Sequence, residues 1–204
     1  MTNKRAVTRR RPKQQRALQT VAAILDAVVR VLKREGFGAI TTNRIAEAAG
    51  VSIGSLYQYF PDKGAIFASL HERHIEQIDR LIAGVLVDHA ASPLDDLIRA
   101  LIEGMIDAHT VDSELFGLLQ SQVPHRAGGA RDFATRLHGA FRLAISARSE
   151  RLKGRHNLDK VVFIVTNMVE ALSHAAAIRR PPVLSLTDAK EEAVRAVLAY
   201  LHTF

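Results

Sequence analysis

The stretch TTNRIAEAAGVSIGSLYQYFPDKGAIF, residues 41–67, decides the fold because its signals for the start and end of a helix stand so close together. Thr41 or Thr42 supplies a side-chain oxygen that can cap a short helix, and Gly50 can take the positive-φ conformation that ends it. Ser52 can cap a second short helix at once. The stretch therefore predicts two short helices joined by a tight turn.

The apolar residues of this stretch predict how the two helices pack. The small Ala46 lets them cross closely, and the seam between them is filled by Ile45, Ala49, Val51 and Leu56. This is the spacing of a helix-turn-helix that reads DNA. An ordinary helical corner would explain the apolar residues, but it would not explain the polar, exposed positions Tyr57 and Gln58.

The N-terminal segment carries the whole charge excess of the chain. The first sixteen residues hold seven basic side chains and no acidic one, while the remainder is balanced, so the formal net charge of +7 lies in this arm. Arg9, Arg10 and Arg11 are its candidate DNA contacts, because a basic run beside a helix-turn-helix can neutralise phosphates. A solubilising tail is the alternative.

The stretch resembles the N-terminal domain of the TetR family of bacterial transcriptional regulators. The resemblance covers roughly residues 17–70, and the rest of the chain resembles the family only in being helical. Two positions depart from the family pattern, Ile53 and Gly64. The residues that carry the resemblance are Thr42, Ile45, Ala46, Ala49, Gly50, Val51, Ser52, Leu56, Tyr57, Tyr59, Phe60 and Lys63.

Each exposed residue of the stretch has an expected role if the second helix enters the major groove. The side chains placed to reach base edges are Ile53, Gly54, Ser55 and Gln58, with Gly54 admitting the backbone closely. The expected phosphate contacts are Thr42, Arg44, Tyr57, Tyr59 and Lys63. Ser52 belongs to the same surface. For Thr42 and Ser52 the alternative is helix capping, and for Arg44 and Lys63 it is solvated surface.

Helical periodicity continues through the rest of the chain, and no alternating strand pattern appears outside it, so the fold is expected to be all-α with about nine helices. We expect a flexible basic arm over residues 1–16, a three-helix helix-turn-helix domain over 17–62, and a larger helical domain for ligand binding and dimerisation over 63–204. Beside the two short helices, the expected helices are 18–35, 62–89, 94–110, 113–122, 133–152, 158–179 and 187–201.

The last two long helices carry more apolar surface than one stripe requires, and the resemblance implies that a second copy of the chain covers the excess. The candidate dimer-interface residues are Val165, Val169, Leu172, Val194, Val197, Leu198 and Leu201. The alternative is that these side chains form the buried centre of one chain.

The resemblance also implies a small-molecule effector in a pocket of the larger domain. Few charges fall at the candidate positions, so a mainly apolar ligand is expected. The candidates are Met105, His109, Phe116, Leu119, Phe133, Phe141, Asn167 and Met168.

Other classes of site receive little support. The chain has no cysteine, so disulfides, thiolate metal sites and cysteine nucleophiles are excluded. The pairs His71–His74 and Glu170–His174 lack a third metal ligand, and no catalytic constellation stands at a recognisable spacing, so we expect no metal, cofactor or catalytic residue. We expect no signal peptide and no apolar run of membrane-spanning length, hence a cytoplasmic protein.

The sequence thus predicts a DNA-binding transcriptional regulator, a ligand-released repressor that binds a palindromic operator as a homodimer. The alternative is an all-helical enzyme, or a carrier of lipids or small molecules, in which the two short helices resemble a helix-turn-helix without binding DNA.

Overall fold

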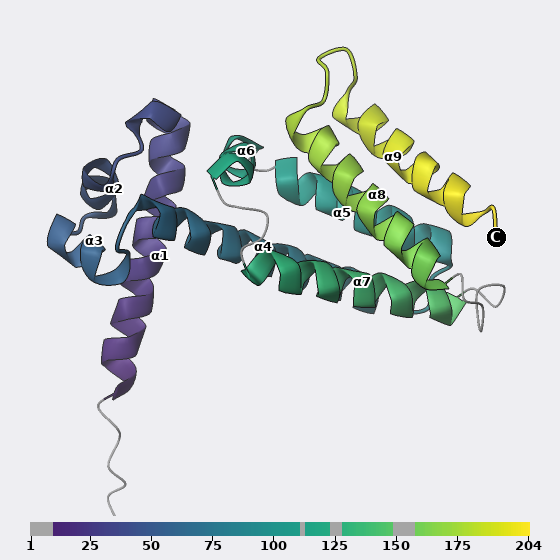
Figure 1. Ribbon diagram of the computed structural model, residues 1–204, viewed down its shortest axis with the longest axis horizontal. Helices are drawn as coiled ribbons and strands as arrows, with labels where there is room; N and C mark the ends of the chain where they lie inside the picture. Colours follow the sequence, from purple (N-terminus) through teal and green to yellow (C-terminus); the bar gives the residue numbers. More distant parts are fainter. Residues whose placement is uncertain (1–9, 111–112, 123–127, 149–157) are drawn as a thin grey trace, which may run out of the picture. The chain divides into compact units, whose positions relative to one another are not determined.

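The computed structural model describes residues 10–110, 113–122, 128–148 and 158–204. Over these residues the chain forms nine α-helices and one short 3-10 helix, and it forms no strand (Figure 1). The prediction of an all-α fold is confirmed. The chain divides into two compact units, an N-terminal unit of residues 1–70 and a C-terminal unit of residues 71–204.

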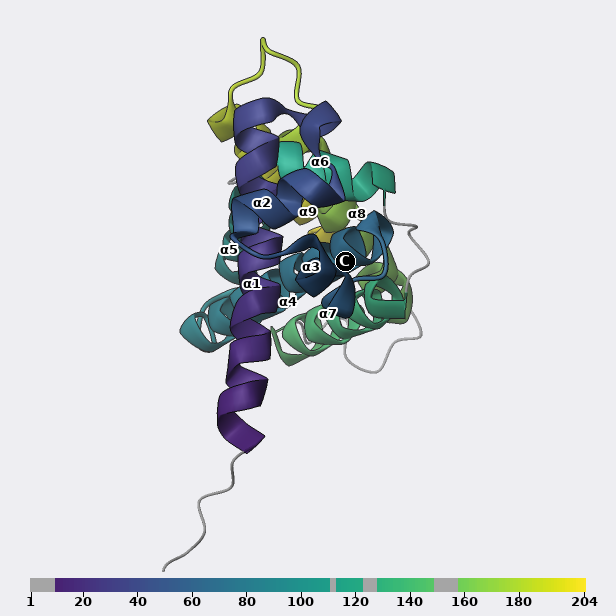
Figure 2. The same cartoon turned by 90° about the vertical axis from the view of Figure 1, so that its left-hand side faces the viewer.

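The N-terminal unit contains α1 (Arg10–Glu35), the 3-10 helix η1 (Phe37–Ala39), α2 (Thr42–Ala49), α3 (Ile53–Tyr59) and the start of α4 (Lys63–Asp88). Helix α2 packs against α1, and α3 packs against α2 (Figures 1 and 2). The long helix α4 continues from this unit into the next, because the boundary between the units follows Leu70.

Helix α1 begins at Arg10, so the predicted start at Leu18 is wrong. The segment from Arg10 to Leu18 is rich in arginine, lysine and glutamine, which favour helix, and Pro12 falls in the first turn, where proline is tolerated. Arg10 and Arg11 therefore lie in the first turn of α1, whereas Arg9 lies outside the described residues. The flexible arm predicted for residues 1–16 is helical where the structure describes it.

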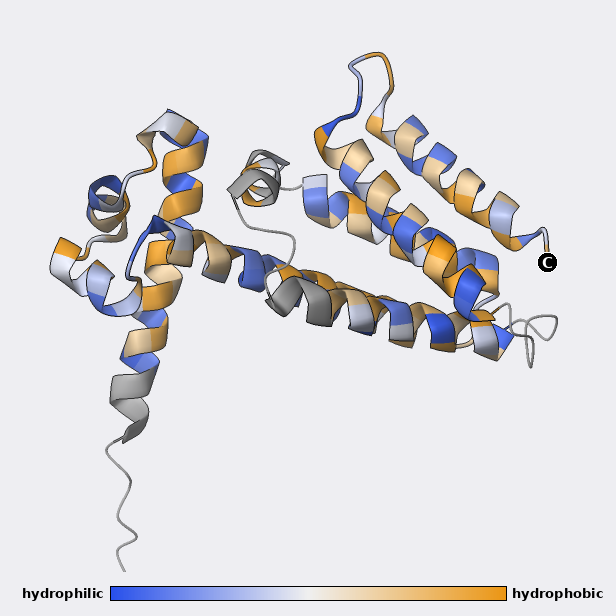
Figure 3. Ribbon diagram, viewed as in Figure 1, coloured by the Kyte–Doolittle hydropathy of each residue, from blue (hydrophilic) through white to orange (hydrophobic). Residues whose placement is uncertain are grey.

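The core of the N-terminal unit joins one side of α1 to α2, α3 and α4. Its side chains are at most 5% exposed, and they include Ile24, Leu25, Val28, Val31, Leu32, Ile45, Ala46, Leu56, Phe60, Ile66, Phe67 and Leu70. Apolar and polar residues alternate along α1 in Figure 3, as expected of a helix with one buried side. Arg30 adds a polar link, since it donates to the carbonyl oxygen of Ala48 over 2.7 Å.

The C-terminal unit contains the rest of α4, with α5 (Leu94–Thr110), α6 (Ser113–Gln122), α7 (Gly128–Arg148), α8 (Leu158–Ile178) and α9 (Leu186–Leu201). The predicted bounds of α5 and α6 are confirmed, those of α8 and α9 differ by one residue at one end, and those of α4 by one residue at both ends. Helix α7 starts at Gly128, earlier than predicted, and residues 149–152 of the predicted helix lie outside the described residues.

Helix α8 packs against α5, α7 and α9, and α5 also contacts α9 (Figure 1). Helix α7 is tied to the α4–α5 loop by Arg148, whose guanidinium donates to the carbonyl oxygens of His89, Ala90 and Ser92 over 2.8, 2.9 and 3.1 Å. The core of this unit therefore centres on α5 and α8.

Most of the predicted dimer-interface side chains lie inside this core. Five of them are at most 6% exposed within a single chain, so they offer no surface to a second copy: Val165, Val169, Val194, Val197 and Leu201. Leu172 and Leu198 are partly buried against the same core. The assignment of these five residues to a dimer interface is wrong, because helical periodicity marks an apolar side without showing which helix covers it.

Helix α8 has the length and composition of a membrane span, contrary to the expectation that no apolar run is long enough. The core of the C-terminal unit takes in part of this apolar surface, including Val161, Val162, Val165, Val169 and Ala176. Phe163, Ile164 and Ile178 of the same helix are exposed.

Candidate nucleic-acid interface

The turn between α2 and α3 is built from three local signals. Thr41 caps α2, accepting a hydrogen bond from the backbone N–H of Arg44 at 3.2 Å. Gly50 ends α2 in the left-handed conformation, with φ 68° and ψ 31°, where any other residue would be strained. Ser52 caps α3 by accepting from the backbone N–H of Ser55 at 3.0 Å. The predicted geometry of two short helices around a tight turn is confirmed.

Helix α3 has one buried side and one exposed side. Leu56 is fully buried and Phe60, just after the helix, is 4% exposed, so they hold α3 to the unit. The opposite side presents Ile53, Gly54, Tyr57, Gln58 and Tyr59, all exposed. Ser55 is half-buried, and its hydroxyl lies 2.8 Å from that of Ser52. The predicted base-reading residues thus share an accessible surface; their contacts with bases stay a prediction.

Two of the predicted phosphate contacts meet in space. The hydroxyl groups of Thr42 on α2 and Tyr57 on α3 are hydrogen-bonded at 3.2 Å. This contact joins the first residue of α2 to the interior of α3, and it places two hydroxyl groups at one point of the surface. Because one hydroxyl donates to the other, the pair has one O–H left, and this group could donate to a phosphate oxygen.

Arg44 is committed to carboxylates of its own unit. Its guanidinium donates to both carboxylate oxygens of Glu35 at the end of α1, with Nε at 3.0 and 2.9 Å, and it pairs with Glu47 at 2.7 Å. The hydrogen bond with Glu35 raises the pKa of Arg44 and lowers that of Glu35. Arg44 therefore fastens α2 to α1, and its contact with phosphate stays a prediction.

Lys63 opens α4 and is half-buried. Its ammonium group donates to the carbonyl oxygen of Ile40 at 3.3 Å and lies 5.7 Å from the ring centre of Phe37 and 5.8 Å from that of Phe67. These cation–π contacts hold the ammonium group of Lys63 close to the two phenylalanine rings. Asp62 caps the helix by accepting from the N–H of Ala65 at 2.8 Å.

An open groove of about 430 Å³ runs between α1 and the helix-turn-helix. Arg16 and Thr20 of α1 line one wall, and Ser52, Ser55, Gln58 and Tyr59 line the other. Arg16 is absent from the predicted DNA contacts, although it ends the basic run. Arg16 would have been a candidate if the basic segment had been recognised as part of α1, because the helix places Arg16 beside α3.

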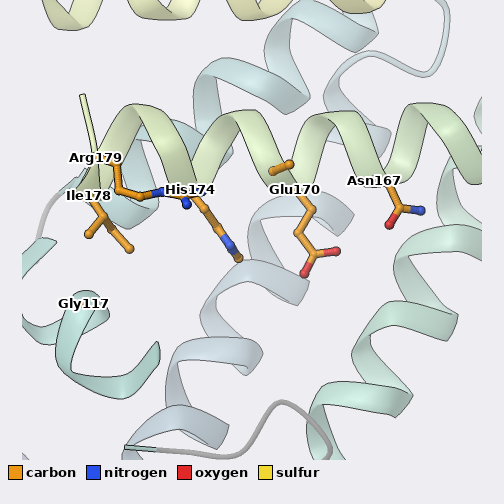
Figure 4. A pocket seen from close by; sticks show the side chains of 7 residues that line it. Gly117, Asn167, Glu170, His174, Ile178 and Arg179 are labelled. Carbon is orange, nitrogen blue, oxygen red and sulfur yellow. The ribbon is translucent and has the colours of Figure 1, made fainter. Parts of the chain in front are cut away.

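A second concave site lies along α8 in the C-terminal unit and has a volume of about 550 Å³. We call it the α8 pocket; its lining residues are Gly117, Asn167, Glu170, Ala171, His174, Ile178 and Arg179 (Figure 4). Asn167 is the one predicted ligand residue that lines it. Met105, Leu119 and Phe141 are at most 1% exposed, and Phe133 and Met168 pack partly buried against the core. The side chain of Phe116 lies outside the described residues.

The predicted ligand residue His109 is buried and belongs to a histidine cluster, with the partly buried His74 and His174, that the sequence did not reveal. Nδ1 of His109 lies 3.0 Å from Nε2 of His74 on α4, and its ring centre lies 4.9 Å from that of His174 on α8. Burial lowers the pKa of His74 to about 4 and that of His109 to about 2, so both are neutral at pH 7. Among the residues described, no three His, Asp or Glu side chains form a metal-binding group.

Comparison with known proteins extends these observations over most of the chain. Residues 24–70 match the family model described as bacterial regulatory proteins, tetR family, and residues 93–201 match the tetracyclin repressor-like C-terminal domain. The second match alone covers more than half of the chain.

Similar curated proteins include the nucleoid occlusion factor SlmA of Haemophilus ducreyi, 42% identical over 65 residues, which are 32% of this chain and 29% of SlmA. The HTH-type transcriptional regulator AcrR of Shigella flexneri is 30% identical over 116 residues, which are 57% of this chain and 53% of AcrR. The chain thus spans about half or less of the curated relatives it matches.

Among solved structures, a TetR-family transcriptional regulator from Streptomyces coelicolor is similar, with a TM-score of 0.63 and 22% identity. The match covers 90% of this chain and 98% of that one, and it shows a shared fold. Because the two family models together span the helix-turn-helix and the larger helical domain, the chain belongs to the TetR family of bacterial regulatory proteins.

Proposed function

We propose that this protein is a DNA-binding transcriptional regulator, a repressor that binds a palindromic operator as a homodimer and is released by a small-molecule effector. The observation that carries the proposal is the surface of α3. Its buried side is anchored by Leu56, while Ile53, Gly54 and Gln58 are exposed beside two capped helix starts. A helix presented in this way can insert into the major groove.

The contacts divide into two groups in this proposal. Ile53, Ser55 and Gln58 read base edges, with Ile53 packing against a thymine methyl group. Thr42, Tyr57, Tyr59 and Lys63 hold phosphates and fix the register without reading sequence, and the basic residues before α1 add attraction that falls with salt. Arg44 supports the surface through its ion pairs with Glu35 and Glu47.

Release requires a ligand that distinguishes two states of the dimer. A hundredfold reduction of operator affinity corresponds to a coupling free energy of about 2.7 kcal/mol. The long helix α4 is the element suited to carry this coupling, since it begins beside Ile40 at Lys63 and contributes His74 to the C-terminal unit. A shift of α4 would change the separation of the two reading helices, which must match successive major grooves about 34 Å apart.

The test is a gel-shift titration with the DNA that flanks the protein's own gene. A cytoplasmic regulator should bind one such fragment at least a thousandfold more tightly than random DNA of equal length at physiological salt. Equal affinity for both DNAs would favour the competing class, a helical enzyme or carrier of small molecules.

A further inference from the structure

The α8 pocket is lined by one cation, Arg179, and one carboxylate, Glu170. Among the described residues, the guanidinium of Arg179 forms no hydrogen bond or ion pair, whereas Glu170 already takes part in a polar interaction. Asn167 also uses its amide nitrogen, which donates to the carbonyl oxygen of Phe163 at 2.7 Å. The uncommitted charge of the pocket is therefore the cation of Arg179.

The pocket has a mixed lining, with Gly117, Ala171 and Ile178 as its apolar residues, and a size that suits a small organic molecule. Asn167, Glu170 and His174 project from the same side of α8 as Ile178 in Figure 4, so polar and apolar groups both line the pocket. A volume of about 550 Å³ falls within the usual range of ligand pockets. Arginine can hold a carboxylate through two parallel hydrogen bonds, so the lining matches an acid with an apolar body.

One residue of the pocket is connected to α4 through the core. The ring of His174 meets that of His109 edge to face, and His109 of α5 is hydrogen-bonded to His74 of α4. His109 is 4% exposed and contacts both other rings, so a displaced His174 would change the packing around His109. His71 of α4 and Glu170 and Arg179 of α8 are the other titratable groups near this chain of rings.

We propose that the α8 pocket binds the effector, that the effector is a small organic acid whose carboxylate is held by Arg179, and that His174, His109 and His74 transmit its presence to α4. The transmission of the signal to α4 rests on the proposed function. The binding of an acid in the α8 pocket rests on the pocket and on Arg179, and it is tested without DNA.

The binding test uses benzoate as the probe, with benzamide and benzylammonium as its neutral and cationic counterparts. Benzoate should bind the full chain with a dissociation constant on the order of 1 mM, and about 10 mM should raise Tm by roughly 3 °C. The two counterparts should have no such effect. Stabilisation by benzylammonium instead of benzoate, or by none of the three, overturns the assignment of an acid.

The site is located by two matched variants. Arg179→Gln should weaken benzoate binding at least tenfold, whereas Arg195→Gln should leave it unchanged. Arg195 is a suitable control because it is an exposed arginine of α9, paired with Glu192, that lines a different cavity, one of about 540 Å³. An effect of Arg195→Gln in place of Arg179→Gln would move the site to α9 and refute the α8 pocket.

The histidine connection is tested with His109→Gln and, should that variant unfold, His74→Gln. Either should keep benzoate binding within about twofold and keep operator binding in the absence of benzoate, but abolish release of the operator by benzoate. Full release in a folded variant refutes the connection. If the unmodified protein fails to select any operator, the proposed function fails while the binding test remains decisive for the pocket.

Discussion

Acid should destabilise this protein through His109, and the structure gives the sign and size of the effect. The ring of His109 is 4% exposed, and burial lowers its pKa from the ordinary 6.5 to about 2. The unfolded chain therefore takes up a proton below about pH 6.5, while the folded chain remains unprotonated at this residue down to about pH 2. The free energy of unfolding must fall as the pH falls through this window.

The magnitude follows from the same two values. At pH 5 an unfolded histidine with a pKa of 6.5 is about 97% protonated, which favours the unfolded state by about 2 kcal/mol relative to a folded state that binds no proton. His74 acts in the same direction, since burial lowers its pKa to about 4, so the folded chain leaves this residue largely unprotonated at pH 5 as well. Its contribution at pH 5 should therefore be similar, and it becomes smaller than that of His109 only below about pH 4.

The assay is urea unfolding at pH 7 and pH 5, comparing the unmodified protein with His109→Gln. Between the two pH values, the free energy of unfolding of the variant should decrease by about 2 kcal/mol less than that of the unmodified protein, whatever its stability at pH 7. Equal decreases in the unmodified protein and His109→Gln would refute the argument that burial keeps His109 neutral.

Four further results are expected. Gln58→Ala should cost about 1–3 kcal/mol in gel shifts against the operator and little against random DNA, with Gln77→Ala as an exposed control; equal costs on both DNAs would assign Gln58 to phosphate contact. Replacing the six basic residues of positions 1–13 by glutamine should reduce the slope of log affinity against log salt by about 0.9 for each phosphate that is no longer neutralised, and an unchanged slope would show that the segment does not reach the duplex. Gly50→Ala should lower the free energy of unfolding by about 1–2 kcal/mol, because a Cβ at φ 68° is strained although no atom lies within 4 Å of it; Gly84→Ala, at another open position, is the control. An effector should weaken binding to the full palindrome strongly and to an isolated half-site hardly at all, and equal weakening would point to distortion of α3 itself.

The helix-turn-helix could be predicted from sequence because its determinants act over a few residues. Thr41, Gly50 and Ser52 each satisfy or redirect backbone groups within one helical turn, and the structure finds each in the predicted role. Helix bounds in the larger unit were also predictable, since caps, prolines and apolar periodicity are local. The start of α1 could not be predicted from the run of charge alone, because such a run also fits an arm, although its residues favour helix.

Only the tertiary structure decided which neighbour each side chain meets. Periodicity marked Val165 and Val197 as apolar, but the packing of α5 against α8 and α9 determined that they belong to the chain's own core. The sequence identifies Arg44 as a surface cation, and the packing of α1 beside α2 gives it Glu35 as a partner. His74, His109 and His174 come from three helices far apart in sequence, so no spacing could show their contact. Local backbone preferences act between near neighbours and are written in the sequence, whereas pairings between helices depend on how their faces are oriented in the folded chain.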